Sequence, residues 1–314
     1  GPDAIFIEQG GKLTRWDKSF TSREKLEDVI QQIVGRCNRV VNEASPIVDA
    51  RLENGARVNA VIYPVALNGP ILTIRRFPDT PVTMEKLIAL GSLPEECAGF
   101  LSKLVKARYS IVIGGGTGSG KTTFLGALSE YIPKDERLIT IEDNAELKIQ
   151  GIDNLVRLEA KMANMAGAAS VSIRDLIKSA LRMRPDRIVV GEVRGGEAVD
   201  MLQALNTGHD GSLSTAHANS SRDMLSRLET MTLMGVELPL EAIRRQIASG
   251  VDILIHLGRM RDKSRKVLEI TEILGFENGE IQTRPLYQWK EGSGLEKISE
   301  LFHREKLERA GIQL

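Results

Sequence analysis

Short runs in which apolar and polar residues alternate dominate the first quarter of the chain, and this period of two predicts strands. The runs are residues 4–16, which reverse at Gly10-Gly11 as a hairpin, 47–52, 56–62 and 71–77. After the hairpin the apolar period becomes helical, with Leu26, Val29, Ile30, Ile33, Val34, Cys37 and Val41 on one face. Thr21 and Glu24 have the spacing of a capping box at the start of this helix. One helix under an antiparallel sheet predicts a small α+β domain over residues 1–80, with Pro78-Asp79-Thr80-Pro81 as the linker.

From residue 81 onward, apolar strand runs alternate with amphipathic helical patterns. The expected strands are residues 109–113, 137–142, 187–191, 212–215 and 251–257. The expected helices are residues 83–91, 94–107, 121–131, 173–183, 197–206, 221–234 and 239–249. This alternation predicts an α/β domain over residues 81–314, with a parallel sheet covered on both faces and a ligand at the carboxyl ends of its strands. Asn278-Gly279 predicts a late hairpin, and the last twenty residues predict an appended amphipathic helix.

A loop of glycines and small residues after the first of these strands matches the phosphate-binding template G-x-x-x-x-G-K-[ST]. In such a loop, backbone N–H groups converge on a phosphate, and the helix that follows aims its positive end at the same anion. Lys121 is placed to reach the β- and γ-phosphates, and the Thr122 hydroxyl to ligate Mg²⁺. The sequence therefore predicts a nucleoside triphosphate site, with binding residues Gly115, Gly116, Thr117, Gly118, Ser119, Gly120, Lys121, Thr122 and Thr123.

Three of the predicted core strands end in polar residues, where a phosphate site would lie. Glu142 ends one strand, Glu192 ends another after Gly191, and Ser214-Thr215-Ala216-His217 ends the third. A carboxylate at such a place can order the shell of Mg²⁺ or take a proton from water. One acid alone would more simply be a solvated strand-end charge, but three such ends beside a phosphate loop favour a site. For His217, a role near the γ-phosphate and a role as a hydrogen-bonded structural histidine both stay open.

Arginines of the first domain have a second interpretation besides surface decoration. Arg57 lies on one predicted strand, and Arg75 and Arg76 end another immediately before the linker. Because the nucleotide domain follows so closely, these side chains could reach a phosphate as arginine fingers. The basic residues at 259–266 are instead expected to form a solvated turn rather than a lipid-binding patch.

Composition limits the classes of protein that fit this chain. Lysine plus arginine number 42 and aspartate plus glutamate 42, so the net charge is zero and nothing global indicates nucleic-acid binding. Cys37 and Cys97 are expected to be buried thiols of a reducing compartment, and two cysteines exclude a four-cysteine zinc site. No apolar run approaches the roughly 20 residues that span a bilayer. We therefore expect a cytosolic protein whose membrane contact goes through a partner; Gly1-Pro2 is typical of a protease scar, which leaves the natural N-terminus open.

Taken together, these motifs resemble the secretion and pilus-assembly ATPases of the type II/IV secretion family over residues 20–290. The stretches that carry the resemblance are Gly-Gly-Thr-Gly-Ser-Gly-Lys-Thr-Thr, Ile-Thr-Ile-Glu-Asp, Val-Val-Gly-Glu-Val-Arg-Gly-Gly-Glu-Ala and Ser-Leu-Ser-Thr-Ala-His-Ala-Asn. They correspond to the phosphate loop, the Asp box, an atypical Walker B strand and the His box of the family. Residues 247–252 and 261–267 look most like the CpaF-type motors of Flp/Tad pili, while conjugation-type secretion ATPases are close relatives that stay open.

The resemblance implies a RecA-like P-loop ATPase domain after a small PAS-like α+β domain, a homo-hexamer, ATP with Mg²⁺, and a membrane-embedded platform protein as partner, with no direct nucleic-acid partner. It implies that Glu192 positions or deprotonates the attacking water, with Glu142 the close second, and that both help Thr122 to hold Mg²⁺, partly through water. His217 would sense the γ-phosphate, and Arg57 and Arg75 would neutralise its charge, with Arg76 a third candidate. The alternatives are a RecA-like nucleic-acid translocase and a nucleotide-binding scaffold without turnover.

Overall fold

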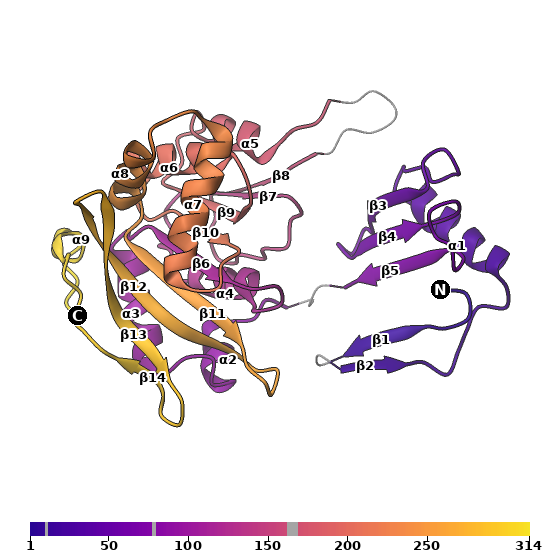
Figure 1. Cartoon of the computed structure of the whole chain (residues 1–314), viewed down its shortest axis with the longest axis horizontal. Coiled ribbons are helices and arrows are strands. Elements are labelled where there is room, and N and C mark those ends of the chain that lie inside the picture. The colour runs from indigo at the N-terminus through magenta and orange to yellow at the C-terminus, as the bar shows by residue number, and fades with distance from the viewer. Residues whose placement is uncertain (10–11, 77–79, 162–168) are drawn as a thin grey trace. The chain divides into compact units, whose positions relative to one another are not determined.

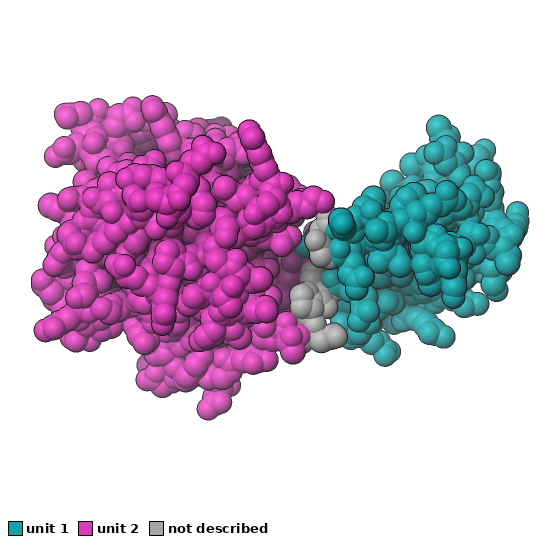
Figure 2. All heavy atoms as spheres, turned by 90° about the horizontal axis from the view of Figure 1, so that it is seen from below, with its two compact units in different colours: residues 1–79 teal, residues 80–314 magenta. Residues whose placement is uncertain are grey.

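The structure, a computed structural model, describes residues 1–9, 12–76, 80–161 and 169–314. The chain divides into two compact units, Gly1–Asp79 and Thr80–Leu314 (Figure 2). The predicted turn at Gly10-Gly11, as well as Pro78 and Asp79 of the predicted linker, lie outside the described residues.

Unit 1 consists of a hairpin, one helix and a three-stranded antiparallel sheet (Figure 1). Its elements are β1 (Phe6–Gln9), β2 (Lys12–Arg15), α1 (Arg23–Arg36), β3 (Ile47–Arg51), β4 (Arg57–Val61) and β5 (Ile71–Arg75). Within α1 the predicted apolar face is buried at Leu26, Ile30 and Val34, which pack on the sheet near Val48 and Ala60. The helix ends at Arg36, so Cys37 and Val41 of the predicted face lie beyond it. The start of the helix differs from the prediction, because Ser22 is extended and its hydroxyl accepts from the Lys25 amide at 3.2 Å. Ser22 rather than Thr21 is therefore the N-cap.

Unit 2 is built on one sheet of nine strands, in the order β14-β13-β12-β11-β6-β10-β9-β7-β8. Its strands are β6 (Ile111–Gly115), β7 (Leu138–Glu142), β8 (Leu155–Glu159), β9 (Arg187–Val193), β10 (Leu213–Ala216), β11 (Ile253–Arg259), β12 (Arg265–Glu277), β13 (Glu280–Lys290) and β14 (Gly294–Lys297). Its helices are α2 (Met84–Ala89), α3 (Glu95–Lys106), α4 (Lys121–Ser129), α5 (Ile173–Ala180), α6 (Ala198–Asn206), α7 (Ser221–Gly235), α8 (Leu240–Gly250) and α9 (Glu305–Arg309).

The sheet is mixed, whereas the sequence predicted a parallel one. The strands from β11 to β8 in this order are parallel, and β12, β13 and β14 continue the sheet antiparallel beyond β11. The predicted hairpin at Asn278-Gly279 is confirmed, and both residues have positive φ, 51° and 80°. β8 was not predicted, because it is an edge strand with a half-exposed pattern rather than an apolar run.

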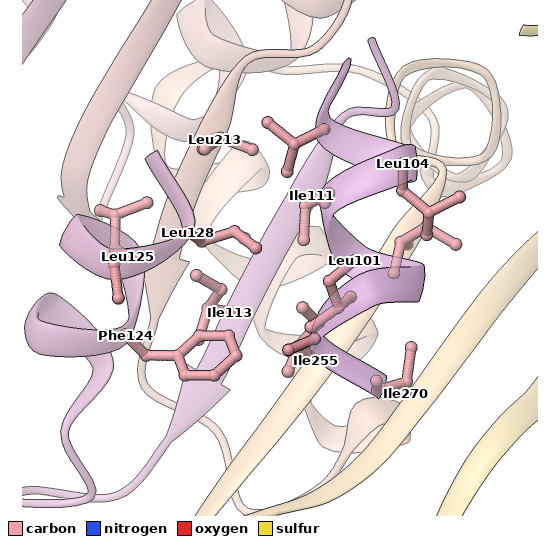
Figure 3. Packing of buried hydrophobic residues seen from close by; sticks show 14 of the residues in the cluster. Leu101, Leu104, Ile111, Ile113, Phe124, Leu125, Leu128, Leu213, Ile255 and Ile270 are labelled. Atoms are coloured by element: carbon pink, nitrogen blue, oxygen red, sulfur yellow. The ribbon is translucent and has the colours of Figure 1, made fainter. Parts of the chain in front are cut away.

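Helices cover both faces of the sheet, as predicted. The apolar residues of α2, α3 and α4 belong to one buried cluster and those of α5 to α8 to another. Figure 3 shows Leu101 and Leu104 of α3 and Phe124 of α4 beside Ile111 and Ile113 of β6. This packing fixes the β6–α4 turn, which carries the phosphate-loop sequence.

The predicted terminal helix is wrong, since α9 covers only five residues. Leu295, Leu301 and Leu307 are each buried in the cluster of α3 and α4. Their spacing of six does not match the helical period, so one continuous helix could not bury all three. Glu272 also accepts from the backbone N–H groups of Phe302 and His303, at 2.8 and 2.7 Å, which holds this segment in a non-helical conformation.

Candidate nucleotide site

The phosphate loop lies between the end of β6 at Gly115 and the start of α4 at Lys121. Gly120 is the N-cap of α4 and has φ 94°, a left-handed conformation that favours glycine. The Ser119 hydroxyl is buried and has no hydrogen-bond partner among the described residues. A loop of this shape before a helix N-terminus fits an anion, because its amides and the helix dipole favour the same charge.

Lys121 is folded against the loop that precedes it. Its Nζ donates to the carbonyl oxygens of Gly115 and Gly116 at 3.1 and 3.4 Å. It also lies 3.6 Å from Glu192 Oε1 and 3.4 Å from His217 Nδ1, with only 8% of the residue exposed. Burial lowers the pKa of Lys121, and the neighbouring Glu192 carboxylate opposes that change. The lysine predicted for phosphate binding thus faces the site and not the apolar core.

His217 joins Lys121 to Glu192 through its two ring nitrogens. Its Nε2 lies 3.0 Å from Glu192 Oε1, and its Nδ1 faces the ammonium of Lys121. Lysine can only donate, so the network assigns the proton of a neutral imidazole to Nε2. Burial and then the Lys121 charge lower the pKa of His217, which favours this neutral form. The neighbouring Thr215 is buried and donates to the Gly191 carbonyl at 2.7 Å, so its hydroxyl fixes the strands instead of facing the site.

Arg194 completes this cluster, and sequence reasoning missed it. Its Nε donates to Glu192 Oε2 at 2.5 Å and its Nη1 to Asp143 Oδ2 at 3.1 Å, so it bridges the ends of β9 and β7. The Glu197 carboxylate orders the loop by accepting from the amides of Arg194 and Gly195 at 2.6 and 3.0 Å. The position of the arginine, two residues after Glu192, was the only signal in the sequence.

Glu142 is held in a different way from Glu192. Its Oε1 accepts from the amides of Glu146 and Leu147, both at 2.9 Å. Its Oε2 is buried and has no hydrogen-bond partner among the described residues. Burial raises the pKa of Glu142, and the two amides act against this increase. The two predicted carboxylates therefore have distinct surroundings. Glu192 contacts Lys121, Arg194 and His217, whereas Glu142 has a buried oxygen without a partner among the described residues.

The atypical glycine of the Walker B strand has a steric explanation. A Cβ added to Gly191 would lie 2.9 Å from Glu142 Cγ, closer than carbon atoms approach in proteins. A side chain at this position would displace Glu142, so the glycine and the carboxylate come as a pair.

Two of the three predicted arginines of unit 1, Arg57 and Arg75, lie together on one face of its sheet. Arg57 is directly opposite Arg75 on β5 and Arg51 on β3, which places the three side chains in a row across the strands. The opposite face carries Val48 and Ala60, which pack on α1. Arg51 was missed because only the strand register reveals it, and Arg76 follows the end of β5.

The described part of the chain contains neither a cluster of metal ligands nor a helix that could span a membrane. No group of three or more His, Cys, Asp or Glu residues within it is arranged to hold a metal ion. Thr122, the predicted Mg²⁺ ligand, is the second residue of α4 and is half-buried. Among the described helices, none is long and apolar enough to cross a bilayer.

The chain is similar to known proteins over most of its length. Residues 1–302 match the profile of a family described as "Type II/IV secretion system protein". A putative conjugal transfer protein of Mycobacterium tuberculosis is 37% identical over 287 residues, which are 90% of this chain and 81% of that protein. The VirB11 ATPase of the Brucella suis type IV secretion system is 30% identical, with a TM-score of 0.51 over 86% of this chain and 89% of that one. The ATPase DotB of Legionella pneumophila has a similar fold, with 23% identity and a TM-score of 0.63 over 88% of this chain and 75% of that one.

Proposed function

Because the chain belongs to the type II/IV secretion system protein family, we propose that it is a Mg²⁺-dependent ATPase that drives a secretion or pilus machine. The observation that carries this proposal is the meeting of Lys121, Glu192 and His217 at the start of α4, on a loop shaped for a phosphate. One helix start and two separate strand ends supply these groups, which a chance glycine-rich turn would not bring together.

In this proposal the phosphate loop and Lys121 bind the triphosphate, and positive charge stabilises the negative charge that develops during transfer. Thr122 would hold Mg²⁺, with Glu142 and Glu192 acting partly through water; the bound ion would neutralise phosphate charge. His217, neutral and hydrogen-bonded to Glu192, is placed beside Lys121, where it would respond to the γ-phosphate.

The surroundings of the two carboxylates favour Glu142 as the group that takes a proton from water. Glu192 accepts from Arg194 and His217 and lies near Lys121, so both of its carboxylate oxygens already have partners within the protein. Glu142 has a buried oxygen without a partner and a raised pKa, which makes it the better base. This reverses the order expected from the motifs, and Glu192 becomes the residue that organises Lys121 and His217.

Arg57 and Arg75 would act from unit 1, on closure over the γ-phosphate in a homo-hexamer. Their shared face is the one opposite to the face that packs on α1. Arg51 belongs to the same row and would add charge there.

The cellular role would be that of one of two branches of the family. Similarity to a putative conjugal transfer protein and to VirB11 favours a conjugation-type secretion ATPase. The resemblance of residues 247–252 and 261–267 to CpaF-type motors supports the Flp/Tad pilus role instead. A membrane platform would be the partner in both cases. A nucleic-acid translocase is disfavoured by the zero net charge, and ATPase stimulation by DNA would reveal it.

The experiment that tests the activity is phosphate release with Mg²⁺ and ATP, compared between the natural chain and Lys121→Ala. We expect the variant to lose turnover by roughly 10²–10³ or more, because a charged donor to the transferring phosphoryl group is removed. Its melting temperature should stay close to that of the natural chain, since Lys121 packs on the loop and not in the core. Equal turnover in both proteins would contradict the assignment of the site.

A further inference from the structure

Two arginines from the β11–β12 hairpin lie against the phosphate loop. Arg259 ends β11 and Arg265 begins β12, and the antiparallel register places them directly opposite each other. Arg265 Nε donates to the carbonyl oxygen of Gly118 at 2.9 Å. A Cβ added to Gly120 would lie 3.1 Å from Arg265 Cδ, and one added to Gly118 would lie 3.8 Å from Arg259 Nη1. The turn is solvated, as expected, and Arg259 and Arg265 are exposed, but Arg265 also contacts the phosphate loop.

We propose that Arg265 is a positioning residue of the nucleotide site, which holds the phosphate loop in its binding conformation and adds positive charge beside the phosphates. Arg259 contributes further charge at the same edge. This inference rests on the ATP site proposed above, and it assigns a role to the start of β12, which lies outside the phosphate loop, the Asp box, the Walker B strand and the His box.

The hydrogen bond acts on the peptide group that joins Gly118 to Ser119. Because the carbonyl and the N–H of one peptide point in opposite directions, a cation at the Gly118 oxygen orients the Ser119 N–H and strengthens it as a donor. Gly118 and Gly120 have φ of 73° and 94°, and glycines sample many other conformations when nothing holds them. A bond that selects one conformation lowers the entropy lost when a phosphate binds.

The base from which Arg265 projects is itself fixed. The next residue, Lys266, donates from Nζ to the Gly91 carbonyl at 2.6 Å, and the amide of Val267 donates to the Ser92 carbonyl at 2.9 Å. Val267 is fully buried. The start of β12 is thus anchored to the turn after α2, which gives the guanidinium a rigid origin and makes its contact with the loop a defined one.

Isothermal calorimetry with MgADP on the full chain tests this role. Arg265→Gln removes the charge and the Nε donor, and we expect Kd to rise about tenfold or more, because the charge-assisted hydrogen bond that orients the loop is lost. Arg265→Lys keeps the charge but lacks the planar guanidinium, so its Kd should lie between those of the natural chain and Arg265→Gln. The matched control is Arg261→Gln, which removes the same charge from an exposed position in the same turn and should leave Kd unchanged.

Steady-state kinetics separate positioning from a purely structural role. The loop holds the phosphates in the ground state and the transition state alike, so Arg265→Gln should raise KM for ATP more than it lowers kcat. A lower melting temperature with an unchanged Kd would overturn the inference, as would an equal loss of affinity in Arg261→Gln. If the natural chain does not bind MgADP, the proposed function is wrong. If the natural chain binds MgADP and Arg265→Gln binds it with the same Kd, only the role of Arg265 is wrong.

Discussion

The two ends of the strands of the central sheet both carry buried charges, but they satisfy them differently. At the amino ends, Arg187 is 0% exposed and pairs with both carboxylate oxygens of Glu136, at 2.5 and 3.0 Å. It also donates to the carbonyls of Val105 and Gly211, at 2.6 and 3.4 Å. At the carboxyl ends, the Ser119 hydroxyl and Glu142 Oε2 are buried without partners among the described residues.

This difference separates charges that hold the fold from charges that await a ligand. A buried ion with all its donors matched serves packing, and losing its partner is costly. Buried polar atoms without a partner are rare in proteins, and two of those in the described residues, Ser119 Oγ and Glu142 Oε2, lie beside the phosphate loop, where another molecule could complete their hydrogen bonds. Glutamate therefore has different roles at the two ends: Glu136 pairs with Arg187, whereas Glu142 keeps one oxygen without a partner among the described residues.

The largest effect on turnover is expected from Arg75→Ala. This arginine belongs to unit 1 and lies at neither end of the central sheet. Arginine fingers contribute roughly 10³–10⁵ to turnover, so this variant should lose most of its ATPase activity. An exposed Arg→Ala change usually shifts stability by only about 0.5 kcal/mol, and the melting temperature should barely change. Phosphate release and thermal unfolding of the same preparation measure both quantities. If activity survives, the proposed closure of unit 1 over the phosphate must be abandoned.

Arg187→Met should show the reverse behaviour. Removing this side chain leaves Glu136 without its main partner, which should cost about 3–5 kcal/mol of unfolding free energy. Urea unfolding measures this loss, and MgADP affinity of the folded fraction should stay near that of the natural chain. An unfolding free energy within about 1 kcal/mol of that of the natural chain would show that the buried charges at the amino ends are not structural.

Glu142→Gln tests the atom that lacks a partner at the carboxyl end. The amide cannot take a proton, so turnover should fall by roughly 10² or more while nucleotide affinity is kept. Glu192→Gln is the matched variant, and we expect a smaller loss because its carboxylate organises Lys121 and His217. Single-turnover hydrolysis compares the two. A larger loss in Glu192→Gln would restore the order of roles expected from the motifs.

The smallest effect concerns pH. A base works only when ionised, and burial raises the pKa of Glu142, so kcat/KM should fall on acidification at a pH above the ordinary glutamate value of about 4.3. Protonation of His217 would place a second cation beside Lys121 and add to the acid loss, although the lowered pKa delays it. A kcat/KM profile from about pH 8 to about pH 5 measures this, with thermal unfolding at each pH as the control. A profile that stays flat would argue against a buried carboxylate base.

Much of this architecture could be predicted because the relevant signals are local. The β6–α4 turn needs glycine at Gly120, a lysine and a strand before it, and all of these are adjacent in the chain. The helical face of α1 and the late hairpin at Asn278-Gly279 follow from periodicity and turn chemistry in the same way. Prediction failed where the deciding partner is distant, as with the terminal segment, whose leucines are buried singly by α3 and the sheet.

By itself, the sequence determined the phosphate loop, the α/β alternation and the strand ends that carry Glu142, Glu192 and His217, since each depends on residues close together in the chain. Only the tertiary structure decided which of these groups meet. Strand order brought Arg194 between two carboxylates, and register aligned Arg51 with Arg57. The β11–β12 hairpin placed Arg265 on a loop 147 residues away along the chain. Hydrogen bonds and charge act over a few ångströms of space regardless of separation in sequence, so these contacts exist only once the sheet has assembled.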